Sequence, residues 1–199
     1  RYVPGSGRED ARWNDHASML SLCIMENVLT PEQLLSPNEY SDIVLMAESY
    51  DYTQLGRPVG SDGDVLKWDP EFSNDLTGET TGWCNNSYAI MPLAGKRRAA
   101  QWDRSGSSSH VVVGTRGPLD GDATLLNPYD ANGEDQPYSN TTHLMAQPGA
   151  WRGFLVFADG HTSLAEGFYP EGSVWKQTDL STGEVLHLPD NVFYADDRA

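Results

Sequence analysis

Apolar residues recur at helical spacing only near the beginning of the chain. Within Ala17–Val28 they return every three or four positions, and Asn14 or Asp15 is placed to cap the amino end of a helix. A second start signal follows in Thr30–Gln33, where a capping threonine precedes a proline at the first helical position and a glutamine at the third. Because Ser36-Pro37 disfavours further helix, the second helix is predicted to be short.

Shorter apolar runs bounded by turn residues predict β-strands in the rest of the chain. The clearest run, Trp151–Phe157, leads into Asp159-Gly160 and then into a polar strand. Asp-Gly favours a tight type I′ turn, so a β-hairpin is predicted over residues 153–165. The same reasoning predicts strands over residues 43–47, 87–91, 110–115, 173–178 and 184–188.

These elements predict an α+β fold in one globular domain spanning residues 1–199. Short N-terminal helices are expected to pack on an antiparallel β-sheet with long loops. The domain would comprise a flexible start over 1–12, a helical part over 13–36 and a β-rich part over 42–199. Long loops are expected at 51–82 and 116–150, and loops of this length are typical of binding surfaces or packed excursions.

Charge and composition narrow the function classes. The 199 residues carry 29 acidic and 13 basic side chains, a formal charge of −16. A charge of this sign disfavours nucleic acid and anionic membrane surfaces as partners. Lys96–Arg98 is the one basic cluster, and a solvated turn is expected there. The many glycines, prolines and aromatic residues suggest an extracytoplasmic domain (periplasm, cell envelope or extracellular).

The two cysteines leave two alternatives open. Cys23 and Cys84 cannot by themselves form a four-ligand zinc site. If paired, they would close a loop of roughly 60 residues, and the disulfide would stabilise the fold by roughly 4 kcal/mol. The alternative is two buried free thiols, since Cys23 lies on the apolar face of the predicted helix.

One acidic loop is a candidate calcium site. The oxygen-bearing residues Asp130, Asn132, Glu134 and Asp135 alternate around a glycine, and Ca²⁺ prefers such ligands. The spacing lacks the closing glutamate of an EF-hand, and the same residues are ordinary turn formers. Calcium is therefore a candidate cofactor, beside a plain acidic turn.

No catalytic motif accompanies these residues. The sequence contains no Gly-x-Ser-x-Gly elbow, zinc-binding His-Glu-x-x-His, P-loop or dinucleotide fingerprint. In Ser107–His110 hydroxyls adjoin an imidazole, but neighbouring strand side chains point to opposite faces and make no triad. The chain is therefore expected not to be an enzyme.

Several segments resemble the soluble part of type IV pilin-like and type II secretion pseudopilin-like proteins of the planctomycete type. The similar segments are, in order, Tyr2–Gly5, Met19-Leu20 with Glu26–Pro37, Asn86–Met91, Trp151–Gly153 and Phe157–His161, followed by the acidic end Asp190–Asp197. Members of this family begin with a hydrophobic, methylated helix that anchors and polymerises the subunits. This sequence lacks that helix and opens directly with Arg1, which suggests a processed or truncated start.

The resemblance implies a non-catalytic structural subunit of a filament, pseudopilus or cell-surface assembly. Its partners would be copies of itself or related pilin-like subunits, with membrane contact only through the missing N-terminal helix. Two alternatives remain. A secreted β-rich binding module for carbohydrate, supported by calcium, would need tryptophans side by side on one exposed face. A secreted hydrolase would need a cleft with a suitable carboxylate pair.

Overall fold

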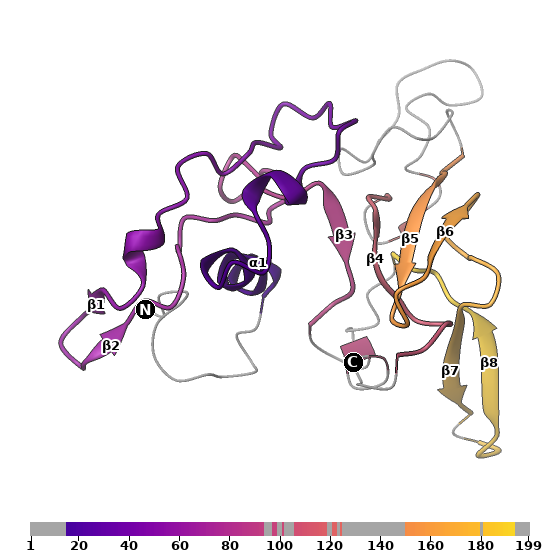
Figure 1. The fold of residues 1–199 in the computed structure, drawn as a ribbon. Helices are drawn as coiled ribbons and strands as arrows, with labels where there is room; N and C mark the ends of the chain where they lie inside the picture. The colour runs from indigo at the N-terminus through magenta and orange to yellow at the C-terminus, as the bar shows by residue number, and fades with distance from the viewer. Residues whose placement is uncertain are drawn as a thin grey trace. The chain divides into compact units, whose positions relative to one another are not determined.

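The computed structural model describes residues 15–93, 97–98, 101, 106–118, 121–122, 124, 150–179 and 181–193. The chain divides into two compact units, Arg1–Tyr88 and Ala89–Ala199. Figure 1 shows the ribbon and the labels used below. Whether the two units behave as the single predicted domain stays a prediction.

The first unit contains helix α1, His16–Met25. The Asp15 carboxylate accepts a hydrogen bond from the Ser18 backbone N–H at 2.7 Å, so Asp15 is the cap that the sequence offered together with Asn14. Asn27 adopts a positive φ of 58° just beyond the helix, which an asparagine tolerates. The predicted helix is confirmed, with its last turn shorter than expected.

The second predicted helix is only a four-residue 3-10 turn, Pro31–Leu34. The Gln33 side chain accepts a hydrogen bond from the Thr30 backbone N–H at 2.9 Å, as the capping pattern predicted. Leu35 is already extended, so one capped turn forms and no helix follows. A further 3-10 turn, Tyr52–Gln54, and the small pair of strands β1 (Pro58–Val59) and β2 (Asp64–Val65) complete the regular structure described in this unit.

The strand expected over residues 43–47 does not form. Val44 makes a single parallel bridge to Cys84, and Cys84 also bridges Asn74. The Asn85 side-chain amide donates to the Leu45 carbonyl at 2.9 Å, so a side chain takes the place of a ladder partner. This part of the unit is irregular chain held by polar side chains.

A four-stranded sheet with the order β3-β4-β5-β6 organises the second unit. Its strands are β3 (Tyr88–Ile90, which crosses the boundary between the units), β4 (Val111–Thr115), β5 (Gly153–Phe157) and β6 (Thr162–Ala165). β5 pairs antiparallel with β4 and with β6. These strands, including the hairpin over 153–165, confirm the sequence prediction.

The hairpin turn differs from the predicted type. Gly160 has φ 88°, whereas Asp159 is not among the described residues with positive φ. The Gly160 N–H donates to the Phe157 carbonyl, and the Phe157 N–H donates to the His161 carbonyl, both at 2.9 Å. This is a three-residue loop in which glycine alone takes the left-handed position, rather than a two-residue type I′ turn.

One face of β5 and β6 contributes to the core of the second unit. Leu155, Phe157 and Ala165 are buried together with Trp151 and Phe168. The segment 190–193 closes this core, because Phe193 contacts Trp151 with ring centroids 5.0 Å apart. The Val192 N–H also donates to the Phe168 carbonyl at 3.0 Å.

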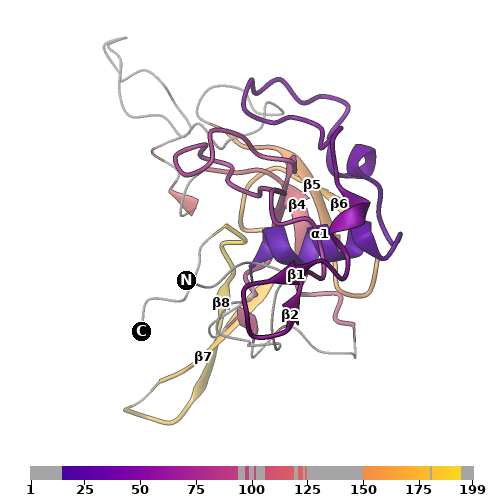
Figure 2. The same ribbon diagram turned by 90° about the vertical axis from the view of Figure 1, so that its left-hand side faces the viewer.

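A separate two-stranded sheet is formed by β7 (Val174–Thr178) and β8 (Val185–Pro189). The pairing is antiparallel, with Lys176 opposite His187 and Trp175 opposite Leu188. Both strands confirm the predicted pair. Figure 2 shows that these two strands, hereafter the ribbon, extend away from β5 and β6.

The predicted α+β fold, with short helices packed on one antiparallel sheet, is wrong. The described residues form eight strands in three sheets, and only α1 is an α-helix of more than two turns. A hydroxyl on the buried side of α1 finds its hydrogen-bond partner in irregular chain of the same unit: Ser21 Oγ donates to the Asp69 carbonyl at 2.8 Å. Across the described residues, the structure contains no helix with the length and apolar character needed to span a membrane.

Candidate functional site

The predicted calcium ligands Asp130, Asn132, Glu134 and Asp135 lie outside the described residues. Within the described part of the chain, no cluster of three or more His, Cys, Asp or Glu side chains is arranged to hold a metal ion. Asp122, in the neighbouring acidic stretch, accepts hydrogen bonds from the Thr124 N–H and hydroxyl at 2.9 and 2.7 Å. These bonds lower the pKa of Asp122, the hydroxyl bond most. The calcium site therefore stays a prediction.

The two cysteines are free thiols in the structure. Cys23 is partly buried on α1, and burial raises its pKa above the usual range. Cys84 is fully buried, and its Sγ donates to the Asn86 carbonyl at 3.1 Å. The two sulfurs form no disulfide in the structure, and whether Cys23 and Cys84 pair stays a prediction.

Asp159 and His161 form an acid–histidine pair on the β5–β6 turn. The Asp159 Oδ1 lies 2.6 Å from the His161 Nδ1, and His161 stacks on Phe157 at 4.2 Å between centroids. The His161 backbone N–H and the side-chain contact lower the pKa of Asp159, in that order. Among the described residues no hydroxyl bonds the other ring nitrogen, and Ser107 and Ser109 instead bond each other at 2.8 Å. The pair orders the turn and lacks a nucleophile.

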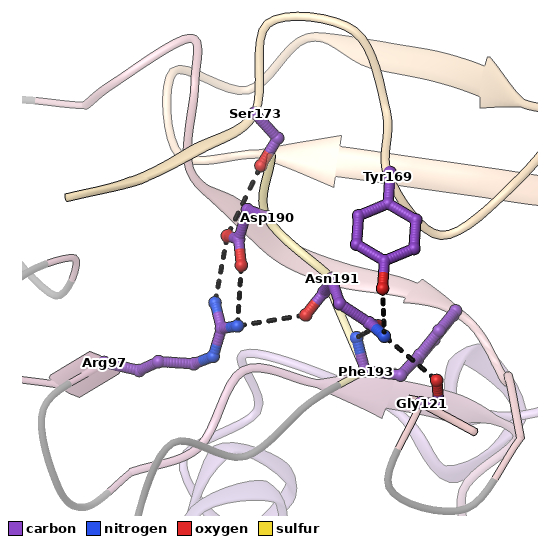
Figure 3. A network of polar contacts seen from close by, with 7 residues as sticks. All are labelled: Arg97, Gly121, Tyr169, Ser173, Asp190, Asn191 and Phe193. Carbon is purple, nitrogen blue, oxygen red and sulfur yellow. Dashed lines mark hydrogen bonds and ion pairs between the residues drawn. The ribbon is translucent and has the colours of Figure 1, made fainter. Parts of the chain in front are cut away.

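A buried ion pair joins Arg97 to Asp190, directly after the carboxyl end of β8. Arg97 donates to both carboxylate oxygens of Asp190, at 3.0 and 2.7 Å, and to the Asn191 carbonyl at 3.0 Å. Its guanidinium also lies over the Trp175 ring at 5.2 Å. Figure 3 shows the bidentate pair, with Ser173 donating to the same carboxylate at 3.4 Å.

This network corrects the expectation of a solvated turn at Arg97, whereas Arg98 is exposed as expected and Lys96 lies outside the described residues. Arg97 is 4% exposed and Asp190 is 2% exposed. The residues lie 93 positions apart in sequence, so no local pattern indicates the pair. The guanidinium fork matches a carboxylate geometrically, which allows two parallel bonds and neutralises both buried charges.

A shallow cleft lies beside this pair. Residues of β3 and β4, together with Asp190, Val192 and Phe193, line it. Its volume is about 30 Å³, which is room for a water molecule or two and far below that of a small-molecule site. Among the described residues that line the cleft, Asp190 is the only carboxylate, and Arg97 already binds it. The cleft therefore offers neither space nor a carboxylate pair for glycoside hydrolysis.

The described tryptophans do not stack on one another to form a platform for sugars. Trp151 is buried in the core, Trp175 lies under Arg97, and Trp68 and Trp83 belong to the first unit. None of the ring contacts among the described residues joins two tryptophans. Trp13 and Trp102 lie outside the described residues.

Among the described residues of the second unit, exposed apolar side chains gather on the ribbon and on β5 and β6, besides the separate Tyr169, and the sequence alone did not single out these surfaces. On the ribbon, Val185 is 51% exposed on one face, while Leu186 and Leu188 are exposed on the other. On the four-stranded sheet, the cross-strand partners Phe154 and Leu164 are 53% and 41% exposed. We call the face of β5 and β6 that carries Phe154 and Leu164 the outer face.

Comparison with models of protein families, with curated proteins and with solved structures returned no match for this chain. The resemblance to pilin-like proteins therefore rests on the sequence segments alone and stays a prediction.

Proposed function

We propose that this chain is a non-catalytic structural subunit that assembles with copies of itself through the second unit. The observation that carries the proposal is the ribbon, whose two faces both expose apolar side chains. Val185 lies on one face and Leu186 and Leu188 on the other, because alternate residues of a strand point in opposite directions.

An isolated two-stranded ribbon is only marginally stable in water. Here the Arg97–Asp190 pair and the Trp175 contact hold its base. The ribbon is thus fixed at this end, while the residues of β8 remain exposed. Exposed apolar groups held in place by a buried ion pair favour contact with another protein surface.

The distribution of charge also favours the ribbon as the surface of contact between copies. The whole chain carries −16, so copies repel each other wherever acidic surfaces meet. The ten residues of β7 and β8 contain one lysine, one histidine and no acidic residue. Asp179 and Glu184 flank the two strands, so only the strand residues themselves carry no negative charge that would repel a second copy.

The test measures the mass of the 199-residue protein by light scattering over a concentration series, at low and moderate salt, with negative-stain imaging. We expect mass to rise with concentration, and to rise more once salt screens the net charge. Val185→Asp should reduce this rise. Leu55→Asp, which replaces an equally exposed apolar residue of the first unit, is the matched control. A mass of one chain under every condition would refute the proposal.

A further inference from the structure

Two Asp-Gly pairs lie in described hairpin loops, Asp62-Gly63 between β1 and β2 and Asp159-Gly160 between β5 and β6. We propose that Asp62-Gly63 is a site of spontaneous isoaspartate formation in the folded protein, whereas the β5–β6 turn protects Asp159-Gly160. This modification does not depend on whether the chain assembles, so it goes beyond the proposed function.

The reaction needs only the chain and water. The Gly63 backbone nitrogen attacks the Asp62 side-chain carboxyl carbon, a carbon–nitrogen bond forms, and one water leaves with a carboxyl oxygen and the amide proton. A second water opens the resulting five-membered succinimide. Opening at the main-chain carbonyl gives isoaspartate, whose backbone runs through the former side chain, and opening at the other carbonyl restores aspartate. One water is lost and one is regained, so nothing is oxidised or reduced.

The two pairs are matched in exposure and in the backbone of the glycine. All four residues are exposed, and the two glycines have φ of 79° and 88°. Apart from chain neighbours, no atom lies within 4 Å of the place where a Cβ would stand on either glycine. Exposure and steric space therefore do not distinguish the pairs, and the difference lies in their hydrogen bonds.

At Asp62-Gly63 the reacting groups are almost unrestrained. The Gly63 N–H donates no hydrogen bond to any described residue. The Asp62 carboxylate accepts one bond from a described residue, that of the Ser61 hydroxyl at 3.0 Å. Because all three residues are exposed, water competes for this bond, which therefore restrains the carboxylate little.

At Asp159-Gly160 both reacting groups are bound. The Gly160 N–H donates to the Phe157 carbonyl at 2.9 Å, and this bond holds the proton that the nitrogen must give up. The Asp159 Oδ1 accepts from the His161 backbone N–H at 3.1 Å and lies 2.6 Å from the His161 Nδ1. These contacts also lower the pKa of Asp159, so less of it is present as the neutral acid that loses water readily.

Two further pairs of the same kind do not enter the comparison. Gly121 is buried and its N–H donates to the Pro118 carbonyl at 3.1 Å, but its partner Asp120 lies outside the described residues. Asn132-Gly133, which can form the same succinimide with loss of ammonia, lies outside them as well. The measurement must therefore resolve each position separately.

The test incubates the 199-residue protein at physiological temperature and mildly acidic pH, once folded and once in urea. Peptide mapping with electron-transfer fragmentation distinguishes isoaspartate from aspartate at each position. In urea both pairs should react, because no turn restrains them. In the folded protein the rate at residue 62 should stay comparable to its rate in urea, whereas the rate at residue 159 should fall about tenfold or more.

Two variants serve as controls. Asp62→Glu keeps the charge but would need a six-membered ring, so isoaspartate at residue 62 should disappear while residue 159 is unchanged. His161→Ala removes the Nδ1 contact and should raise the rate at residue 159 in the folded protein by about threefold or more, with residue 62 unchanged. Circular dichroism verifies that each variant is folded.

Each outcome decides the inference. Isoaspartate at residue 62 of the folded protein, with residue 159 protected and then released by His161→Ala, supports it. Reaction at residue 62 only in urea refutes it, because the folded loop then prevents the attack. An equal fall of both rates on folding also refutes it, and so does an unchanged rate at residue 159 in His161→Ala. The mass of the protein in solution plays no part in these outcomes, so they leave the proposed function to its own test.

Discussion

The two units reach a defined structure by different means. In the first, polar side chains bind the backbone of irregular chain: Asp75 accepts bonds from the N–H groups of Thr77, Gly78, Thr80 and Thr81, at 2.7 to 3.2 Å. In the second, four strands and the aromatic contacts of Trp151, Phe168 and Phe193 form the core. The first unit therefore combines its buried apolar residues with many bonds from side chains to the backbone, whereas the second combines sheet and aromatic packing with a buried ion pair.

In each unit, a deeply buried polar contact joins segments that are distant in sequence. In the first unit, the Tyr50 hydroxyl donates to the Ser21 carbonyl at 2.6 Å, joining α1 to a loop 29 positions later. In the second, Arg97 and Asp190 join segments 93 positions apart. Both contacts satisfy groups that would be costly to bury alone, but only the second buries full charges.

The largest expected effect comes from breaking this ion pair. Arg97→Ala leaves the Asp190 carboxylate buried without its partner, which should lower the free energy of unfolding by about 3–5 kcal/mol. Chemical denaturation measures the loss, and hydrogen exchange locates it. We expect faster exchange in residues 153–193, with residues 15–88 little changed.

The double variant Arg97→Met with Asp190→Leu is the control, because it leaves no unpaired charge. It should be closer in stability to the unaltered protein than Arg97→Ala is. Equal destabilisation of the two variants would show that shape, rather than charge, holds the segment. Faster exchange in both units alike would show that they unfold together.

A smaller effect is expected where the aromatic core meets a glycine. A Cβ on Gly117 would lie 2.4 Å from the Phe193 ring. Gly117→Ala should therefore displace the closing segment 190–193 and cost about 1–3 kcal/mol, measured by thermal unfolding. In a Phe193→Leu background the same substitution should cost less. If Gly117→Ala lowered the stability equally in the Phe193→Leu background, the Phe193 ring would not be the group that the added Cβ displaces.

The smallest effect is expected in the first unit, at Asp75. The Thr77 hydroxyl, with backbone N–H groups of Thr80, Thr81 and Thr77, lowers the pKa of Asp75 to about 2. Asp75→Asn should cost about 1 kcal/mol near neutral pH, since one carboxylate oxygen becomes a donor facing other donors.

The pH dependence has a fixed sign. Because the folded pKa of Asp75 is lowered, the stabilisation is complete above the ordinary aspartate pKa and is lost as pH falls towards 2. Melting curves of the unaltered protein and Asp75→Asn should therefore differ near pH 6 and converge near pH 2. A difference independent of pH would assign the effect to geometry rather than to charge.

Local patterns predicted the local elements well. Spacing predicted α1, and apolar runs between turn residues predicted β3 to β8, because these signals arise within a few residues of one another. The Thr30–Gln33 pattern correctly predicted a capped turn but not its length. For residues 43–47 the strand propensity gave only one bridge, between Val44 and Cys84, and the Asn85 side chain binds the next carbonyl, that of Leu45.

The candidate surfaces were harder to predict. The sequence marks β8 as an ordinary strand. It does not indicate which of the side chains Val185, Leu186 and Leu188 the folded chain leaves exposed. The calcium ligands and the cysteine pair were chosen by residue type, which indicates chemistry without indicating proximity.

The amino-acid order by itself determined where the chain turns, where it extends and that its surface is strongly acidic. Only the tertiary structure decided that Ser21 of α1 bonds irregular chain of its own unit, that Arg97 is buried against Asp190, and that Val185 remains exposed on the ribbon. The reason is physical: backbone geometry and capping act over a few residues, whereas burial depends on which distant segment arrives to exclude water.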